Sequence, residues 1–202
     1  NAVDIDHLTK TQQASATNGL QRLLENQSEP LSTIAVDMMK RSQNLFAESI
    51  YRRLGFSFGD TGSAVVAQVL DDWGIQRNRA IVVDGSGLSR YNYLTASALT
   101  DILVQLHQNA LDQNLFLATL PIASQDGTLR NRFKGTAAMG NVHAKTGSMS
   151  HVRSLAGYVK TADGERLAFS ILANNFSADP IDVVNAIDDF VSALATMSRG
   201  SF

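Results

Sequence analysis

The sequence predicts an α+β fold in which helices pack against an antiparallel sheet. The sheet is indicated by two β-rich runs in the C-terminal third, "VRSLAGYVKT" and "RLAFSILANN". These runs flank "ADGE", and an Asp-Gly pair between two such runs is typical of a two-stranded hairpin. The helices are indicated by apolar residues at helical spacing through most of the chain between Pro30 and the hairpin.

The N-terminal part of the chain divides into a tail and two expected helices. Residues 1–19 are polar with weak periodicity, which indicates a tail or the end of a missing upstream region. Ser32 is the expected N-cap of the first helix. A second helix is expected from about Leu45 to Leu54, and Gly55 is expected to end it.

Further elements are expected in order along the rest of the chain. Helical patterns cover residues 60–73 and Thr95–His107, the latter with its first residue as the cap, and a short buried strand is expected at 80–85. The segment "NVHAKTGS", at 141–148, is expected to form a third antiparallel strand beside the hairpin. Residues 179–197 have an apolar stripe and are expected to close the chain as an amphipathic helix.

Composition restricts the function classes. The chain has 202 residues, of which 44% are hydrophobic and 18% charged, so it is long enough to bury a core as one domain or as part of a larger one. A net charge of -2 without a basic block argues against nucleic acid and anionic membranes as partners. There is no cysteine, and the four histidines lack metal-ligand spacing, so neither disulfides nor a metal site are predicted.

The segment "HAKTGSMSH" at 143–151 raises the question of what a lysine does between small residues. Lys followed by Thr also ends a phosphate-binding P-loop, but that loop requires glycine where this chain has Ala144 and Met139. An isolated Lys-Thr-Gly is otherwise an exposed hairpin lysine. The choice between a surface residue and a site residue therefore depends on the rest of the chain.

A second short motif, Ser42-x-Asn44, lies at the expected junction of two helices, roughly a hundred residues before Lys145. The surrounding stretches are "KRSQNLFAESIYRRLG", "VDGSGLSRYN", "DGTLRNRF" and "AKTGSMSHVRSLAGYV". Together they resemble the C-terminal half of the D-alanyl-D-alanine carboxypeptidase/endopeptidase family, the class C low-molecular-mass penicillin-binding proteins. The resemblance covers about residues 20–175. It implies that residues 20–202 are the C-terminal part of a penicillin-binding, transpeptidase-like domain exported to the bacterial periplasm or cell envelope.

The resemblance implies a reaction and its partners. The family moves an acyl group from a peptidoglycan stem peptide ending in D-Ala-D-Ala onto a serine and then to water, without a cofactor, and β-lactam antibiotics bind at the same site. Ser42 would relay a proton to the departing amine, and Asn44 would bond the substrate's amide carbonyl. Lys145 would supply positive potential to the relay and attract the substrate carboxylate.

Three further residues would bind the substrate. The hydroxyls of Thr146 and Ser148 would hold the carboxylate, and Gly147 would leave room for the peptide to pair with the strand. The backbone N–H of Ser148 would form half of the oxyanion hole. Asp84, in "DGSGLSR", is expected to bond the backbone of its own turn, and "DGTL" is also interpreted as structural.

One element of the family pattern is missing. The family's nucleophile belongs to a Ser-x-x-Lys motif, and no serine of this chain has lysine three residues later. The missing N-terminal half of the same protein is therefore expected to supply it. Two alternatives stay open: a catalytically silent module that binds stem peptides, or part of a β-lactamase. The β-lactamase is disfavoured because its usual deacylating Glu motif is not evident, whereas "DGSGLSR" is typical of the peptidase family.

Overall fold

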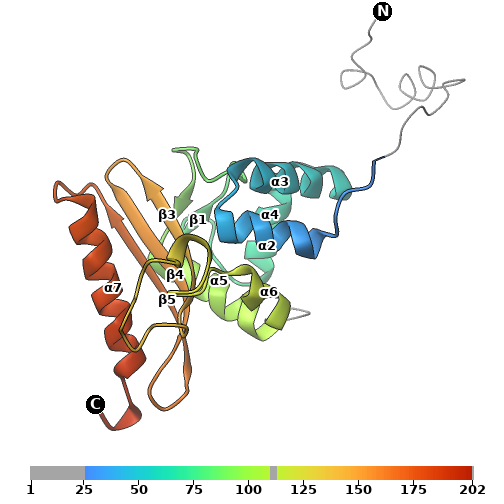
Figure 1. The fold of residues 1–202 in the computed structure, drawn as a ribbon. Coiled ribbons are helices and arrows are strands. Elements are labelled where there is room, and N and C mark those ends of the chain that lie inside the picture. Colours follow the sequence, from blue (N-terminus) through green and yellow to red (C-terminus); the bar gives the residue numbers. More distant parts are fainter. Residues whose placement is uncertain (1–25, 110–112, 202) are drawn as a thin grey trace, which may run out of the picture. The chain divides into compact units, whose positions relative to one another are not determined.

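The computed structural model describes residues 26–109 and 113–201 (Figure 1). The chain divides into two units, Asn1–Pro30 and Leu31–Phe202, and the fold below is that of the second. The tail expected at residues 1–19 lies outside the described residues. None of the described helices is long and apolar enough to cross a bilayer.

Three strands form the predicted antiparallel sheet in the order β3-β4-β5. They are β3 (His143–Met149), β4 (Val152–Lys160) and β5 (Arg166–Asn174). Lys145 pairs with Ala156 in the first ladder, and Lys160 pairs with Arg166 at the end of the second. The "ADGE" turn closes the hairpin as expected, with Gly164 at a φ of 81° that favours glycine. The α+β fold is confirmed.

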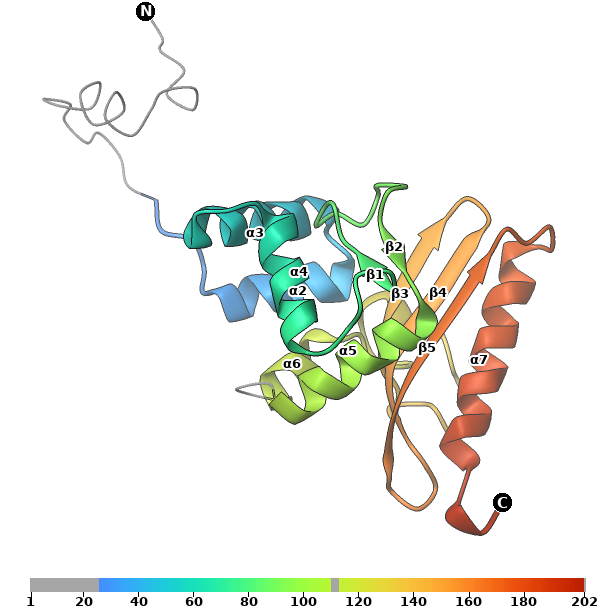
Figure 2. The ribbon, with the colours of Figure 1, turned by 180° about the vertical axis from the view of Figure 1, so that it is seen from behind.

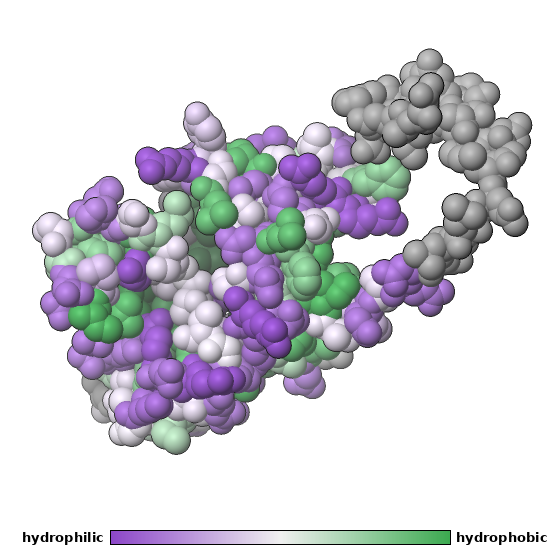
Figure 3. Space-filling model, turned by 45° about the horizontal axis from the view of Figure 1, so that its top comes forward, coloured by the Kyte–Doolittle hydropathy of each residue, from purple (hydrophilic) through white to green (hydrophobic). Residues whose placement is uncertain are grey.

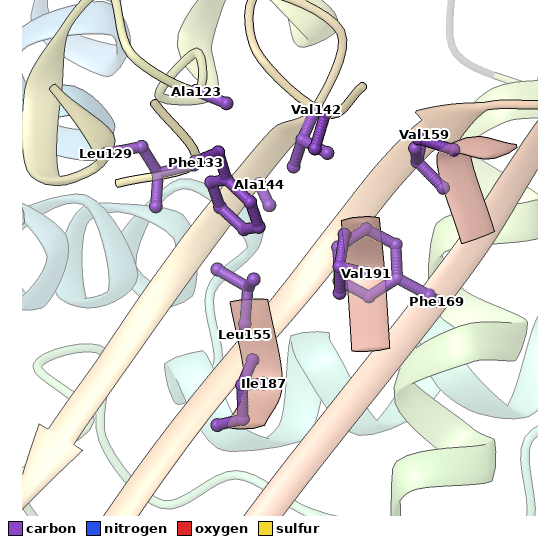
Figure 4. Packing of buried hydrophobic residues seen from close by; sticks show 12 residues of the cluster. Ala123, Leu129, Phe133, Val142, Ala144, Leu155, Val159, Phe169, Ile187 and Val191 are labelled. Atoms are coloured by element: carbon purple, nitrogen blue, oxygen red, sulfur yellow. The ribbon is translucent and has the colours of Figure 1, made fainter. Parts of the chain in front are cut away.

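The sheet has a helix on each face (Figures 1 and 2). On one face, Leu155 and Phe169 pack against Ile187 and Val191 of α7 (Pro180–Thr196), as Figure 4 shows. On the other face, Tyr158 packs against α5 (Ala96–Asn109). Because Leu155 and Tyr158 are an odd number of positions apart on β4, their side chains point to opposite faces.

Tyr158 and Thr95 fix α5 in place. The Tyr158 hydroxyl donates to the carbonyl of Leu103 at 2.6 Å, and burial raises the pKa of Tyr158 to about 12. At the start of α5, the Thr95 hydroxyl accepts a hydrogen bond from the backbone N–H of Ala98 at 3.1 Å, which confirms the predicted cap.

Three further helices precede the sheet in the chain: α2 (Leu31–Arg41), α3 (Asn44–Phe58) and α4 (Gly62–Asp72). The prediction that Gly55 ends a helix is wrong, because Gly55 lies inside α3 and the helix ends at Gly59 with a left-handed φ of 70°. A Cβ at Gly55 would lie 2.4 Å from the backbone N of Gly62, so this glycine permits close packing of α3 and α4. Ser32 lies within α2 rather than capping it.

The remaining elements are short. The strand expected at 80–85 is reduced to β1 (Ala80–Ile81), which pairs with β2 (Tyr93–Leu94). The other short elements are α6 (Gln113–Thr119), η1 (Gly127–Leu129) and η2 (Arg199–Ser201). Of these, η1 determines part of the site.

Candidate active site

The turn between α2 and α3 places Ser42. The backbone N–H of Gln43 donates to the carbonyl of Met38 at 2.9 Å, and this bond closes the end of α2. Ser42 has a φ of 56°, which for a residue with a side chain costs roughly 1–2 kcal/mol. Strain of this kind is common at functional sites, because the surrounding structure holds the residue in an unfavourable conformation.

Lys145 reaches Ser42 from β3. Its ammonium donates to the Ser42 hydroxyl at 2.7 Å and to the carbonyl of Thr146 at 2.8 Å. The two residues are 103 positions apart, and the family resemblance implies that they meet. Burial lowers the pKa of Lys145. No carboxylate among residues 26–109 and 113–201 pairs with it, so its charge faces only hydroxyl and carbonyl oxygens.

Around this pair lies a cleft of about 790 Å³, on the hollowed face of the space-filling view (Figure 3). Its lining contains all six residues that the sequence selects, namely Ser42, Asn44, Lys145, Thr146, Gly147 and Ser148. Apolar side chains from α2, β2 and the sheet complete it, among them Met38, Met39, Leu94, Val152 and Leu172. The cleft therefore combines a polar edge along β3 with a broad apolar wall.

Thr128 of η1 also lines the cleft, although it is not among the six residues predicted from the sequence. The Thr146 hydroxyl donates to the Thr128 hydroxyl at 2.9 Å. The "DGTL" segment, interpreted from sequence as structural, therefore also brings a hydroxyl to the site. A threonine that follows Asp-Gly is also common in ordinary turns, so the sequence does not indicate that Thr128 lines the cleft.

A partly buried ion pair holds "DGTL" against α2. Lys40 donates to one carboxylate oxygen of Asp126 at 2.6 Å, and the other oxygen accepts from the backbone N–H of Ile122 at 2.9 Å. Gly127 has a φ of 54°, and a Cβ there would lie 2.7 Å from the carbonyl of Lys40. The position of Thr128 thus depends on a charge pair and on a glycine at a crowded contact.

Residues 85–88 of the "DGSGLSR" segment also line the cleft, and Asp84 organises this segment as expected. The Asp84 carboxylate accepts from the backbone N–H groups of Gly87 and Ser89, both at 3.1 Å, and from the side chains of Ser86 and Asn92. Burial alone would raise the pKa of Asp84, but these four donors hold it below its ordinary value. The Asp84 pattern supports a structural role.

Gly147 has a close neighbour on the next strand. A Cβ at Gly147 would lie 2.3 Å from the Ser154 hydroxyl, because the two residues are directly paired between β3 and β4. The family resemblance explains this glycine by room for a substrate. The structure adds a second reason, namely room for Ser154.

We expect Gly147→Ala to lower the free energy of unfolding by about 1 kcal/mol, because Ser154 must leave its position. Adding Ser154→Ala should restore stability, since the nearest remaining atom would be 3.6 Å away. Urea unfolding of the single and double variants measures this. A single variant as stable as the parent would show that Ser154 imposes no constraint.

The two histidines that flank the motif do not line the cleft. His143 is half-buried, and its Nδ1 atom is buried without a hydrogen-bond partner in the described part of the chain. Burial lowers the pKa of His143, a hydrogen bond to the Leu117 backbone opposes this, and Lys40 lowers the pKa further. His151, in the β3–β4 turn, bonds the carbonyl of Phe176 through Nδ1 at 3.0 Å.

We expect His143 to make the fold sensitive to acid. Since its folded pKa is lowered, the unfolded chain binds more protons between that pKa and about 6.5, so stability falls as pH falls through this window. Thermal unfolding of the parent and His143→Gln at pH 5 to 8 measures the difference. His151→Asn is the control, because asparagine tolerates the φ of 56° there. An unchanged pH dependence in His143→Gln would contradict the expectation.

The fold and this pairing of Ser-x-Asn with Lys-Thr-Gly define a class, that of the penicillin-binding proteins and β-lactamases. Residues 3–196 match the model of the D-Ala-D-Ala carboxypeptidase 3 (S13) family. The chain belongs to this family.

Individual relatives agree with this assignment. The chain is 40% identical over 176 residues to the D-alanyl-D-alanine carboxypeptidase of Actinomadura sp. (strain R39), covering 82% of this chain and 32% of that protein. It is 34% identical over 170 residues to the D-alanyl-D-alanine carboxypeptidase DacB of Haemophilus influenzae, covering 80% and 35%.

A solved structure shows the same fold. Penicillin binding protein 4 (dacB) from Haemophilus influenzae, complexed with a β-lactam, superposes with a TM-score of 0.76 at 30% identity. The match covers 88% of this chain and 46% of that one. The chain thus spans about a third of the length of the curated relatives and less than half of the solved one.

Proposed function

We propose that this chain is the C-terminal half of a serine-type D-Ala-D-Ala carboxypeptidase/endopeptidase acting on peptidoglycan stem peptides through an acyl-serine intermediate. The observation that carries the proposal is the 2.7 Å hydrogen bond from Lys145 to Ser42 at the edge of the cleft. Family membership supports the reaction class. Residues 20–202 are then the C-terminal part of the catalytic domain, and the site of action is the periplasm or cell envelope.

The nucleophile is a serine of a Ser-x-x-Lys motif outside these 202 residues. Two observations support this: no such motif occurs in the chain, and the matched part of the chain covers only 32% and 35% of the two relatives. The apolar wall of the cleft, with Met38, Met39 and Leu172, suits a packed segment of protein better than a polar peptide. A helix that carries the nucleophile would bury this wall.

Each residue then has one role. Ser42 passes a proton to the departing amine, because its hydroxyl can accept and donate, and Lys145 keeps this relay polarised. Asn44 bonds the amide carbonyl of the substrate. Thr146 and Ser148 hold the carboxylate of the leaving residue, and Gly147 lets the peptide pair with β3.

The oxyanion hole is completed by both halves. The backbone N–H of Ser148 supplies one donor and the nucleophilic serine supplies the other. Removing one such donor typically costs about 10²- to 10³-fold in rate. Because the nucleophile lies outside this chain, the chain alone does not turn over substrate.

The test is release of D-alanine from an N-acylated peptide ending in D-Ala-D-Ala by the complete protein, with benzylpenicillin as a stoichiometric inhibitor. We expect both release and inhibition. A complete protein that binds the peptide without releasing D-alanine would instead support the silent binding module.

A further inference from the structure

Thr128 and Thr146 form a pair of hydroxyl groups in the wall of the cleft. Both residues line the cleft, and their side-chain oxygens lie 2.9 Å apart although the residues are 18 positions apart in the chain. The pair joins two elements, because Thr146 belongs to β3 and Thr128 to η1. The proposed function uses only the hydroxyl of Thr146, so the hydroxyl of Thr128 still lacks a role.

The two hydroxyl hydrogens of this pair have different surroundings. The Thr146 hydroxyl donates its one hydrogen to the oxygen of Thr128. The hydrogen of Thr128 has no acceptor within residues 26–109 and 113–201. Because Thr128 is exposed and lines the cleft, a ligand in the cleft can accept this hydrogen. An ionised carboxylate suits the position, since it only accepts hydrogen bonds and accepts them more strongly than a neutral group does.

The residues next to Thr128 hold it in place. Asp126 pairs with Lys40 of α2 at 2.6 Å, and Leu129 is fully buried in the core that α7 covers. Gly127 lies against the carbonyl of Lys40, where a Cβ would lie at 2.7 Å. Because its neighbours are fixed on both sides, Thr128 is already ordered before a ligand arrives. Binding a ligand through such a residue costs little conformational entropy.

We infer that Thr128 is a further substrate-binding residue, which donates a hydrogen bond to the carboxylate of the leaving residue beside Thr146. The inference rests on the proposed function, in which Thr146 holds this carboxylate. When the carboxylate enters, the Thr146 hydroxyl turns from Thr128 to one carboxylate oxygen, and Thr128 donates to the other. One bond between neutral hydroxyls is thereby exchanged for two bonds to a charged group, which are the stronger kind.

The test is the steady-state release of D-alanine from an N-acylated peptide ending in D-Ala-D-Ala by the complete protein. Thr128→Val keeps the shape of the side chain but removes its hydroxyl. We expect it to raise KM by about 10-fold with kcat nearly unchanged, because the carboxylate is bound equally in the ground state and the transition state. Thr128→Ser retains the hydroxyl and should retain the parental KM. Thr33→Val is the matched control, since Thr33 is exposed on α2 and does not line the cleft.

A double-mutant cycle separates direct binding from an effect through Thr146. If Thr128 contacts the carboxylate itself, Thr128→Val should also lower kcat/KM by about 10-fold in the Thr146→Val background. If Thr128 only orients Thr146, the substitution would have no effect in that background, and the inference would be wrong. It would also be wrong if Thr128→Val kept the parental KM, or if Thr128→Ser or Thr33→Val raised KM as much as Thr128→Val.

Failure of the proposed function would look different. The parent protein would then release no D-alanine and would not be acylated by benzylpenicillin. The unfolding temperature of each variant reports whether the fold is intact. We expect Thr128→Val to unfold at the parental temperature, because its side chain is exposed and the neighbouring residues hold η1 in place.

Discussion

Replacing Lys145 with methionine is expected to lower the rate of acylation by benzylpenicillin by about 10²- to 10³-fold, the range typical of removing one electrostatic contact to a transition state. Methionine has a similar length and no charge, so the relay through Ser42 loses its polarising neighbour. The 2.7 Å bond between the two side chains is the basis for this expectation. Stopped-flow acylation of the complete protein measures it.

The same substitution is not expected to destabilise the fold. Burial lowers the pKa of Lys145, so its ammonium destabilises the fold at neutral pH, and this cost is relieved only as pH rises toward the unfolded pKa of about 10.4. Lys145→Met should therefore not lower the unfolding temperature at pH 7. Lys160→Met is the control, since Lys160 is exposed at the end of β4. If the Lys145→Met variant unfolded, Lys145 would have a structural role. If it were acylated at the parental rate, Lys145 would have no role in acylation.

Removing the Ser42 hydroxyl is expected to reduce turnover of the D-Ala-D-Ala peptide by about 10²- to 10⁴-fold, the usual contribution of a positioned proton donor or acceptor. Two substitutions separate the hydroxyl from the backbone. Ser42→Ala keeps a Cβ in the left-handed region, whereas Ser42→Gly removes both the hydroxyl and the strain.

The comparison of these two variants is decisive. If the hydroxyl is the relay, both lose activity equally, although Ser42→Gly should be the more stable by roughly 1 kcal/mol. Steady-state release of D-alanine and urea unfolding measure the two quantities. If Ser42→Gly kept most of the activity, Ser42 would act through its backbone conformation alone.

The sequence predicts the polar edge of the site because its motifs are local. Ser42-x-Asn44 and Lys145-Thr146-Gly147 are each contiguous, and their resemblance to the motifs of a known family implies that they meet in one site. The hairpin and the closing helix were also predictable, since a turn signal and an apolar stripe lie within one segment each.

Other features depend on contacts between distant residues. Thr128 reaches the site because Lys40 binds Asp126, 86 positions further along, and nothing in "DGTL" by itself indicates that ion pair. The sequence predicts a helix end at Gly55, but this residue lies inside α3, where a Cβ would lie 2.4 Å from the backbone N of Gly62. In the sequence, a glycine that allows two helices to pack closely looks the same as a glycine that ends a helix.

The strand expected at 80–85 illustrates competition for hydrogen bonds. The backbone N–H of Val83 donates to the side chain of Asn92 at 2.8 Å, and that of Gly85 donates to the Glu48 carboxylate at 2.9 Å. Because side chains take these donors, the ladder with β2 stops after Ile81. An apolar run predicts that a segment is buried, but it does not predict which residues accept hydrogen bonds from the backbone N–H groups of that segment.

The central claim is that this chain supplies the relay and binding half of the site and that the nucleophile lies elsewhere. It is tested most directly by acylating the complete protein with benzylpenicillin and locating the penicilloyl group by peptide mass spectrometry. We predict a single adduct, on the serine of a Ser-x-x-Lys motif outside residues 1–202. A stoichiometric adduct on any serine between Asn1 and Phe202 would contradict the assignment of Ser42 and Lys145.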